Sequence, residues 1–332
     1  MLTFLILPIT LSLLPLILTF SNTSNHKPIV GILSQPSDFN ETHPTDNYSY
    51  IASSYVKFVE SSGARVVPIP YDLPNEELKE IFQSINGLLF PGGSASLWQN
   101  ESTRLEMSEF TKKGQYLVNL AIEANLNGDY FPIWGTCLGY ELMMIAIAND
   151  PTILSLYNSS NHRLPLSLKN MKYSRIFDRI DERLKKFVQN HDISYFNHHY
   201  GMDTNNFLRN GILSQLFTIT STAKTENGTE FIGSIEGLKL PFYGVQFHPE
   251  KSPFEWRITV NASHIEEAIQ ISQEYGNFLV REARKNNHKF FNETFEEKNL
   301  IYNYKTEKVH ESFMECYFFK NRSESIMRID LP

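Results

Sequence analysis

From residue 28 onward, the chain alternates between short apolar runs and segments with helical periodicity. Residues 28–33 (PIVGIL) predict a buried strand, and residues 50–62 carry apolar side chains at the spacing of a helix that Gly63 ends. Further strands are predicted at 64–70, 88–90, 131–134, 217–222, 231–236 and 242–247, and further helices at 75–84, 116–126, 140–148 and about 264–285. Strands that alternate with helices are typical of an α/β fold, with a mostly parallel sheet covered on both faces.

Two segments give no clear pattern. Residues 150–210 lack regular alternation, and the polar segment after Asn286 is expected to pack on the surface or to be partly mobile. The sequence shows no linker and no internal repeat. We therefore expect one domain over residues 28–320 and a C-terminal tail over residues 321–332.

The N-terminus carries an uncharged apolar run, residues 2–20, followed at once by polar residues. This pattern predicts a secretory signal peptide over residues 1–21. An uncleaved membrane anchor is the alternative, because the run is nearly long enough to span a bilayer, but Pro8 and Pro15 favour cleavage. No other run approaches that length, so we expect no membrane partner after cleavage. The expected location is the extracellular space or the lumen of a lysosome or vacuole.

Asn-x-Ser/Thr triplets support the secretory route. Chance would give about four such triplets in a chain of this composition, and the sequence has more. The glycosylation candidates are Asn22, Asn40, Asn47, Asn100, Asn158, Asn227, Asn261, Asn292 and Asn321.

Composition excludes several classes of protein. The 332 residues are 41% hydrophobic and 20% charged, which is globular rather than disordered composition. A formal net charge of -7 argues against a nucleic-acid partner, which requires a basic face. Two cysteines, Cys137 and Cys316, exclude a disulfide-rich scaffold and a zinc site built from four thiolates.

Cys137 lies between two glycines, in Gly135-x-Cys137-x-Gly139, where a predicted strand meets a predicted helix. This is the pattern of a nucleophile elbow with cysteine in place of serine. The positive end of the helix dipole is expected to favour the thiolate. The backbone N–H of Leu138 is then one expected donor to an oxyanion.

A candidate base follows the predicted strand 242–247, in His248-Pro-Glu250. Residues i and i+2 of an extended chain lie on the same side, so Glu250 can accept from one imidazole nitrogen while the other faces the thiol. The pattern predicts a Cys137–His248–Glu250 triad of nucleophile, base and orienting acid. A purely structural His–Glu pair is the alternative.

Gly92 and Gly93 follow the predicted strand 88–90 and are candidates for the second oxyanion donor. Ligands bind at the carboxyl ends of strands in open α/β sheets, and glycine lets the backbone approach them closely. Taken alone, the pair is equally consistent with an ordinary tight turn. Cys316 has no base motif nearby and is expected to be a buried thiol, because a bridge to Cys137 would remove the nucleophile.

The motifs GTCLG, PGG and HPE together resemble the class I glutamine amidotransferase superfamily, and within it the γ-glutamyl hydrolase family (peptidase family C26). The resemblance runs from Pro28 to about Phe319. It is strongest in YIASSYVKFVESSGARVVPI, INGLLFPGGS, DYFPIWGTCLGYE, EGLKLPFYGVQFHPEKSPFEW and FLVREARKNNHKF. It implies a three-layer α/β sandwich of the glutamine amidotransferase-like (flavodoxin-like) type.

The same resemblance implies a thiol hydrolase that removes γ-linked glutamates from poly-γ-glutamyl folates and antifolates, without metal or cofactor. It implies Cys137, His248 and Glu250 as catalytic residues. It also implies a further histidine, aligned to His198 with His199 as the alternative, and pocket positions at Tyr50 and Glu141.

Several questions stay open at this stage. A polyanionic substrate calls for cationic groups in the groove, and Arg104, Lys112, Lys113 and His198 are candidates. A glutaminase that passes ammonia to a synthase, and a non-catalytic secreted glycoprotein of the same fold, are the alternative functions. The sequence decides neither internal versus terminal cleavage nor whether the chain forms a homodimer.

Overall fold

The computed structural model describes residues 24–39, 42–45, 47–309 and 313–322. The predicted signal peptide, Asn22, Asn40 and most of the predicted C-terminal tail lie outside these residues. Within the described ranges, no helix is both long enough and apolar enough to cross a membrane.

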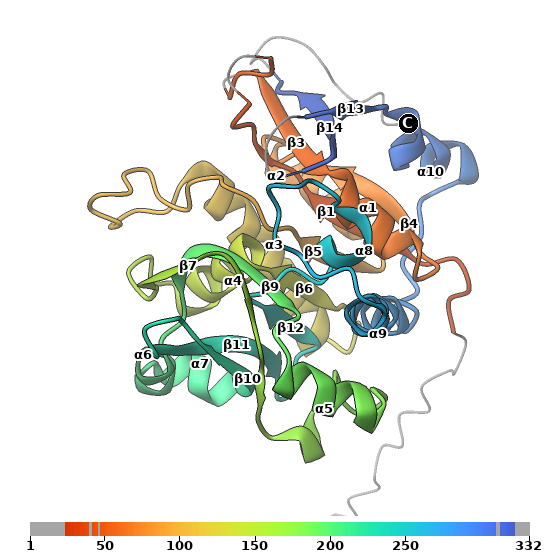
Figure 1. Cartoon of the computed structure of the whole chain (residues 1–332). Coiled ribbons are helices and arrows are strands. Elements are labelled where there is room, and N and C mark those ends of the chain that lie inside the picture. Colours follow the sequence, from red (N-terminus) through yellow and green to blue (C-terminus); the bar gives the residue numbers. More distant parts are fainter. Residues whose placement is uncertain (1–23, 40–41, 46, 310–312, 323–332) are drawn as a thin grey trace, which may run out of the picture.

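An eight-stranded sheet forms the centre of the described structure (Figure 1). Its order is β4-β1-β5-β6-β12-β11-β10-β8, and the five strands from β4 to β12 pair in parallel, whereas β11, β10 and β8 continue the sheet antiparallel. In this order the strands are Arg65–Ile69, Ile29–Leu33, Gly87–Phe90, Ile133–Thr136, Phe242–Val245, Glu230–Gly237, Phe217–Lys224 and Ser167–Leu168. The sheet is thus mostly parallel, as predicted.

Helices cover both faces of this sheet. Successive side chains of a strand point to opposite faces, and in β1 Ile29 and Leu33 join one buried cluster while Val30 and Ile32 join the other. The first cluster includes α2 (Asn75–Phe82), α3 (Glu109–Leu126), α4 (Leu138–Ala148) and α7 (Gly211–Leu216). The second includes α1 (Ser53–Glu60), α5 (Glu182–Asn190) and α9 (Glu266–Ala283). The predicted three-layer α/β sandwich is confirmed.

A second, four-stranded sheet changes two sequence-based expectations. It has the order β13-β14-β3-β2, with strands Thr306–Lys308, Glu315–Lys320, Tyr48–Ala52 and Gln35–Pro36. The helix predicted from residue 50 therefore begins only at Ser53, because residues 48–52 pair with β14. The described part of the segment after Asn286 contains α10 (Glu293–Asn299), a short 3₁₀ turn (Ile301–Asn303), β13 and β14, and so it contributes two strands to the second sheet.

The segment that gave no pattern contains a two-stranded ribbon, β7 (Ser155–Leu164) with β9 (Ser194–Gly201). The region also contains β8 of the main sheet, a 3₁₀ turn (Met171–Tyr173), α5 and α6 (Thr204–Arg209). In Figure 1 the ribbon lies beside β12 and α4. The carbonyl oxygen of Asn197 on β9 lies 3.7 Å from Sγ of Cys137. The ribbon also carries His198 on β9.

Candidate active site

The predicted turn at Cys137 is a sharp junction between β6 and α4. Cys137 is the only residue between them and has φ 49° and ψ -112°, a region that residues other than glycine seldom adopt. A side chain on Gly139 would collide with the carbonyl oxygen of Phe90, and one on Gly135 would lie 2.8 Å from the backbone of Tyr140. Both flanking glycines are therefore required for α4 to start so abruptly against the sheet.

The side chains of Cys137 and His248 both lie next to the backbone of Gly92. The Cys137 N–H donates to the carbonyl of Val245 at 2.8 Å, which fixes the elbow to the end of β12, three residues before His248. A Cβ built on Gly92 would lie 2.7 Å from Cε1 of His248 and 3.2 Å from Cβ of Cys137. The nucleophile and base candidates therefore flank the same point of the backbone.

Glu250 holds the imidazole of His248 from the other side. Its Oε1 lies 2.8 Å from Nδ1 of His248, and both side chains are buried. Nε2 of His248 is buried and has no hydrogen-bond partner in the described part of the chain. That nitrogen is therefore available to receive a proton, on the logic of a catalytic triad.

The thiol of Cys137 departs from one expectation. It is only 3% exposed, and this burial raises its pKa well above the ordinary value, with the nearby Glu141 acting in the same direction and the Leu138 N–H opposing. Burial thus outweighs the helix dipole, and the resting group is the neutral thiol. Neither Cys137 nor Cys316 forms a disulfide, so the sulfur is chemically free.

The two glycine candidates for the oxyanion hole are not equivalent. The N–H of Gly92 donates to the hydroxyl of Tyr55 at 2.8 Å, whereas no described group accepts from the N–H of Gly93. Gly93 also lines the cavity beside His248, which favours it over Gly92. Leu138 is the first residue of α4, where N–H groups lack an acceptor within the helix.

Tyr55 is a site residue that the sequence did not reveal, because its spacing placed it on the apolar face of a helix. Its hydroxyl lies 3.3 Å from Nδ1 of His248 and also bonds to the carboxylate of Glu250. Burial raises its pKa well above the ordinary value, so the hydroxyl stays protonated. Tyr55 thus links the Gly92 backbone to the His248–Glu250 pair.

A cavity of about 210 Å³ opens beside His248. It is lined by Asp38, Phe39, Gly93, Ser94, Asn197, His248, Lys251 and Phe313. Lys251 is only 1% exposed, and its ammonium group lies 4.2 Å from the ring centre of Phe313. Burial lowers the pKa of Lys251, and the carboxylates of Glu250 and Glu255 oppose that shift.

Lys251 is the cation of this cavity, and it was not among the four groups proposed from the sequence. Lys112 pairs with Glu109 at 2.7 Å, and Lys113 donates to the carbonyl of Leu73, both from α3. The guanidinium of Arg104 packs over the rings of Trp98 and Tyr200, outside the cavity lining. The position of Lys251 directly after the HPE motif was the available signal.

His198 is buried on β9, whereas His199 is exposed, which favours His198 among the two candidates. Nδ1 of His198 lies 2.6 Å from the carbonyl oxygen of Tyr200, and its Nε2 has no described partner. Burial lowers the pKa of His198 to about 3, and the neighbouring His248 acts in the same direction. His198 is therefore neutral at physiological pH and does not provide a positive charge.

The two other predicted pocket residues, Tyr50 and Glu141, are buried and do not line the cavity. Tyr50 is fully buried, with its ring 5.1 Å from that of Phe39 and 6.2 Å from that of Phe313, two residues of the lining. Glu141 accepts from Nε2 of Gln246 at 2.8 Å. Burial raises the pKa of Glu141 to about 8, so it is largely protonated at neutral pH.

Comparison with known proteins gives a consistent result. Residues 28–250 match the Peptidase C26 family. The chain is 42% identical to gamma-glutamyl hydrolase of Rattus norvegicus, over 84% of this chain and 84% of that protein. It is 38% identical to gamma-glutamyl hydrolase B of Dictyostelium discoideum, over 93% of this chain and 87% of that protein. It is also 38% identical to gamma-glutamyl hydrolase of Homo sapiens, over 88% of this chain and 90% of that protein.

Proposed function

The chain belongs to the peptidase C26 family, and on this premise we propose that Cys137, His248 and Glu250 hydrolyse the γ-glutamyl bonds of folylpoly-γ-glutamates. The enzyme is a cysteine-type hydrolase of γ-glutamyl bonds. One observation carries the assignment of residues: Cys137 and His248 flank Gly92, and Glu250 binds the far nitrogen of the imidazole.

The reaction begins with a neutral thiol. Nε2 of His248 accepts the thiol proton, and Glu250 stabilises the imidazolium that results. The Cys137 sulfur attacks the γ-amide carbonyl, and the N–H groups of Leu138 and Gly93 stabilise the oxyanion. His248 then protonates the departing amine, and the carbon–nitrogen bond breaks to leave a thioester. Water, deprotonated by the same imidazole, hydrolyses the thioester and restores the thiol.

Lys251 gives the cavity its affinity for this substrate class. A γ-linkage leaves every α-carboxylate free, so the scissile bond has a carboxylate close on both sides. A buried ammonium group beside His248 can bind one of them through a charge-assisted hydrogen bond. Phe39 and Phe313 also line the cavity, and their apolar rings lower the local polarity, which strengthens that contact.

A comparison of two cysteine variants tests the proposal. We expect Cys137→Ala to lower the turnover of a di-γ-glutamyl folate by about 1,000-fold or more, because it removes the nucleophile. Cys316→Ala is the matched control, since it removes the other buried sulfur and should retain activity. Chromatography of the released glutamate gives the rate, and circular dichroism checks the fold. Undiminished turnover by Cys137→Ala would refute the assignment, and preferential hydrolysis of free glutamine would refute the substrate class.

We further propose that the chain acts in the secretory pathway, in an organelle lumen or outside the cell. The apolar N-terminal run and the excess of glycosylation triplets support this location. Among the described candidates, Asn47, Asn100, Asn227, Asn261 and Asn292 are exposed. Asn321 is the poorest candidate, because it is half-buried and its amide donates to the carbonyl of Thr45. Asn158 belongs to β7, and the exposure of its side chain lies outside the description.

A further inference from the structure

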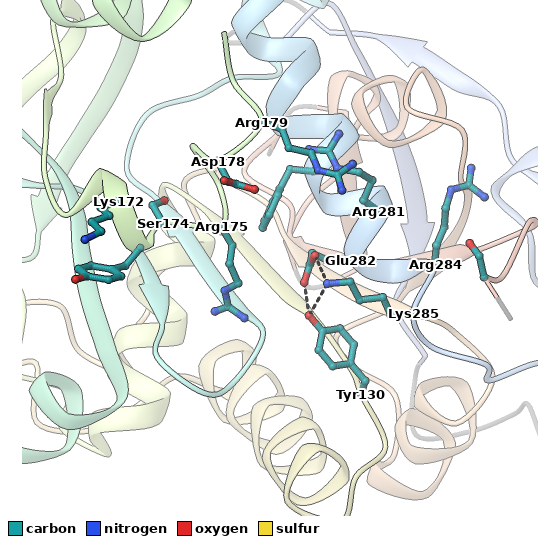
Figure 2. Close-up of a pocket in the computed structure, with 13 residues that line it drawn as sticks. Tyr130, Lys172, Ser174, Arg175, Asp178, Arg179, Arg281, Glu282, Arg284 and Lys285 are labelled. Carbon is teal, nitrogen blue, oxygen red and sulfur yellow. Dashed lines mark hydrogen bonds and ion pairs between the residues drawn. The ribbon is translucent and has the colours of Figure 1, made fainter. Parts of the chain in front are cut away.

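A larger pocket, of about 690 Å³, is shown in Figure 2. One wall contains Tyr130, which precedes β6, whereas Cys137 follows that strand. The other walls come from residues 172–179 and from the C-terminal part of α9. Its volume falls within the roughly 300–1,000 Å³ of small-molecule sites. It is separate from the proposed catalytic cavity, and no lining residue is shared.

The charge of this pocket is opposite to that of the whole chain. The chain has a net charge of -7, yet the pocket gathers cationic side chains and includes only two carboxylates, Asp178 and Glu282. The cationic residues are Lys172, Arg175, Arg179, Arg281, Arg284 and Lys285. Like charges at such density repel one another in the empty site, and a bound anion removes that repulsion.

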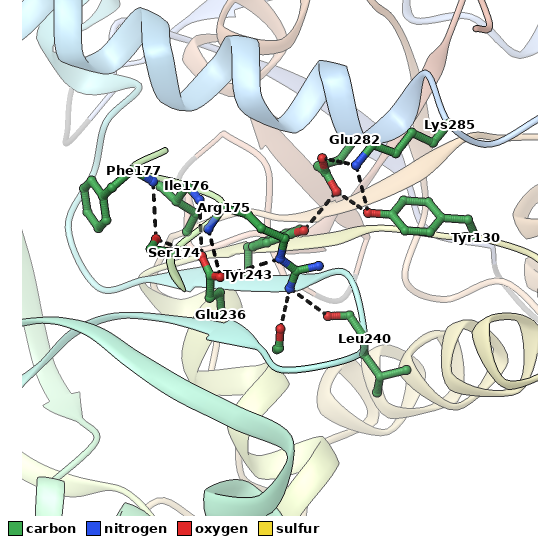
Figure 3. A network of polar contacts seen from close by, with 11 residues as sticks. Tyr130, Ser174, Arg175, Ile176, Phe177, Glu236, Leu240, Tyr243, Glu282 and Lys285 are labelled. Atoms are coloured by element: carbon green, nitrogen blue, oxygen red, sulfur yellow. Dashed lines mark hydrogen bonds and ion pairs between the residues drawn. The ribbon is translucent and has the colours of Figure 1, made fainter. Parts of the chain in front are cut away.

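A buried carboxylate fixes the loop that carries three of these cations (Figure 3). Glu236 is 2% exposed and accepts from the hydroxyl of Ser174 at 2.9 Å, the N–H of Arg175 at 3.0 Å and the N–H of Ile176 at 3.2 Å. The guanidinium of Arg175 donates to the carbonyls of Gly237 and Leu240. The loop is thus held to β11 before any ligand arrives.

The other buried carboxylate, Glu282, also makes hydrogen bonds within the protein. Its carboxylate accepts from the hydroxyls of Tyr130 and Tyr243 and from the ammonium of Lys285 (Figure 3). Arg284 donates to the carbonyls of Asn25 and Gly63. These contacts build the walls of the pocket and leave its remaining cations uncompensated.

Within the part of the chain that the structure describes, three pocket cations have neither an ion pair nor a side-chain hydrogen bond: Lys172, Arg179 and Arg281. The ammonium of Lys172 lies 5.5 Å from the ring centre of Tyr173. Figure 2 shows the side chains of Arg179 and Arg281 next to each other. Burial lowers the pKa of Arg281, and the charge of Arg179 adds to this shift, against the opposing carboxylates of Glu274 and Glu282. Two adjacent guanidinium groups without ion-pair partners among the described residues match an anion that carries two charges on one group.

We propose that this basic pocket binds a small ligand that carries phosphate groups, held by the guanidinium forks of Arg179 and Arg281. One phosphate dianion can neutralise both guanidinium groups, whereas a carboxylate neutralises only one. Lys172, on the same loop as Arg179, is placed for a further phosphate or another anionic group. The aromatic faces of Tyr173 and Phe278 in the lining can hold an apolar part of the ligand.

Calorimetric titration of the full chain with inorganic pyrophosphate tests the proposal. We expect one pyrophosphate per chain, and a Kd that rises by about 10-fold or more in the double variant Arg179→Gln/Arg281→Gln. The matched control is Arg163→Gln/Arg209→Gln, which removes the same charge from two exposed positions outside the pocket. This control should leave the Kd within about two-fold of the unmodified chain.

Three results would overturn the proposal. The first is no binding of pyrophosphate up to about 1 mM. The second is an equal loss in both double variants, which would indicate general attraction by the surface. The third is binding of penta-γ-glutamate, but not pyrophosphate, that depends on Arg179 and Arg281, which would indicate a carboxylate site. Because the readout is binding rather than turnover, the outcome is independent of the proposed hydrolytic function.

Discussion

Cys137 combines two features that are each unfavourable for an ordinary residue. Its backbone has a positive φ, and its sulfur is buried where ionisation is disfavoured. Both features suit a nucleophile that is held on a sharp turn and that loses its proton only when His248 takes it. The neutral resting thiol is also less prone to oxidation than a free thiolate, since oxidation follows thiolate character.

Lys251 provides a test at the scale of one side chain. We expect Lys251→Met to lower kcat/KM by about 10-fold to 100-fold, mainly through KM, because a charge-assisted bond contributes about 1.5–3 kcal/mol. A series of substrates, each with a single α-carboxylate replaced by a carboxamide, identifies which carboxylate Lys251 binds. The unmodified enzyme should discriminate against one of these amides, and Lys251→Met should not.

The control for this prediction is Lys251→Arg, which keeps the positive charge and should restore part of the discrimination. Discrimination that persists undiminished in Lys251→Met would mean that another group binds the carboxylate. A structural role of Lys251 alone would lower the rates on all substrates equally.

Glu141 makes stability depend on pH. Burial raises its pKa to about 8, above that of a glutamate in the unfolded chain, so the folded state binds the proton more tightly. The stability that the protonated Glu141 provides is fully present below about pH 4 and is lost as pH rises through the folded pKa, by on the order of 5 kcal/mol in all. We expect Glu141→Gln to gain stability relative to the unmodified chain from pH 5 to pH 8. Urea denaturation at several pH values measures this difference.

Glu80→Gln, at an exposed carboxylate of α2, is the control for the Glu141 series. Parallel stability curves for Glu141→Gln and the unmodified chain would show that Glu141 ionises normally in the folded state.

At the scale of elements, the close contact of α4 with β5 sets the position of the elbow. Gly139 lies in the first turn of α4, and its Cα faces the carbonyl of Phe90 at the end of β5. We expect Gly139→Ala to destabilise the fold by on the order of 3 kcal/mol, because the helix must move away from the strand. Activity should fall as well, since the shift moves Cys137. Thermal unfolding and turnover measure the two effects.

Gly211→Ala is the matched control for Gly139→Ala. Gly211 begins α7, and a side chain there would meet nothing within 4 Å, so stability should be unchanged or slightly higher. Equal stability of the two variants would contradict the packing argument.

At the scale of the whole molecule, the second sheet joins distant parts of the chain around the cavity. β14 pairs with β3, and between them they contribute Tyr50 and Phe319 to the core, while Phe313, just before β14, forms a wall of the cavity. We expect a chain that ends at Val309 to lose activity and to show a Tm lower by about 10 °C or more. A chain that ends at Arg322 keeps β14 and is the control. Full activity of the shorter chain would show that the second sheet is dispensable.

The alternation of apolar runs and helical segments was enough to predict the layers, because buried parallel strands and amphipathic helices have distinct local patterns. Residues 48–52 show the limit of that method. The sequence predicted a helix from residue 50, but residues 48–52 form a strand because they pair with residues 316–320, far along the chain, and with residues 35–36. The sequence did not predict the ribbon of β7 and β9. Its two strands pair with shifts in register, which disturb the regular alternation of side chains that marks a strand.

The sequence by itself determined the fold class, the elbow at Cys137 and the candidate base and acid, because each depends on residues close together in the chain. Only the tertiary structure decided which of Gly92 and Gly93 has a free N–H, that Tyr55 links the backbone to His248, and that Lys251 is the cation of the cavity. It also decided that Cys137 rests as a thiol. Burial and contact between distant segments set these properties, and neither is encoded in local spacing.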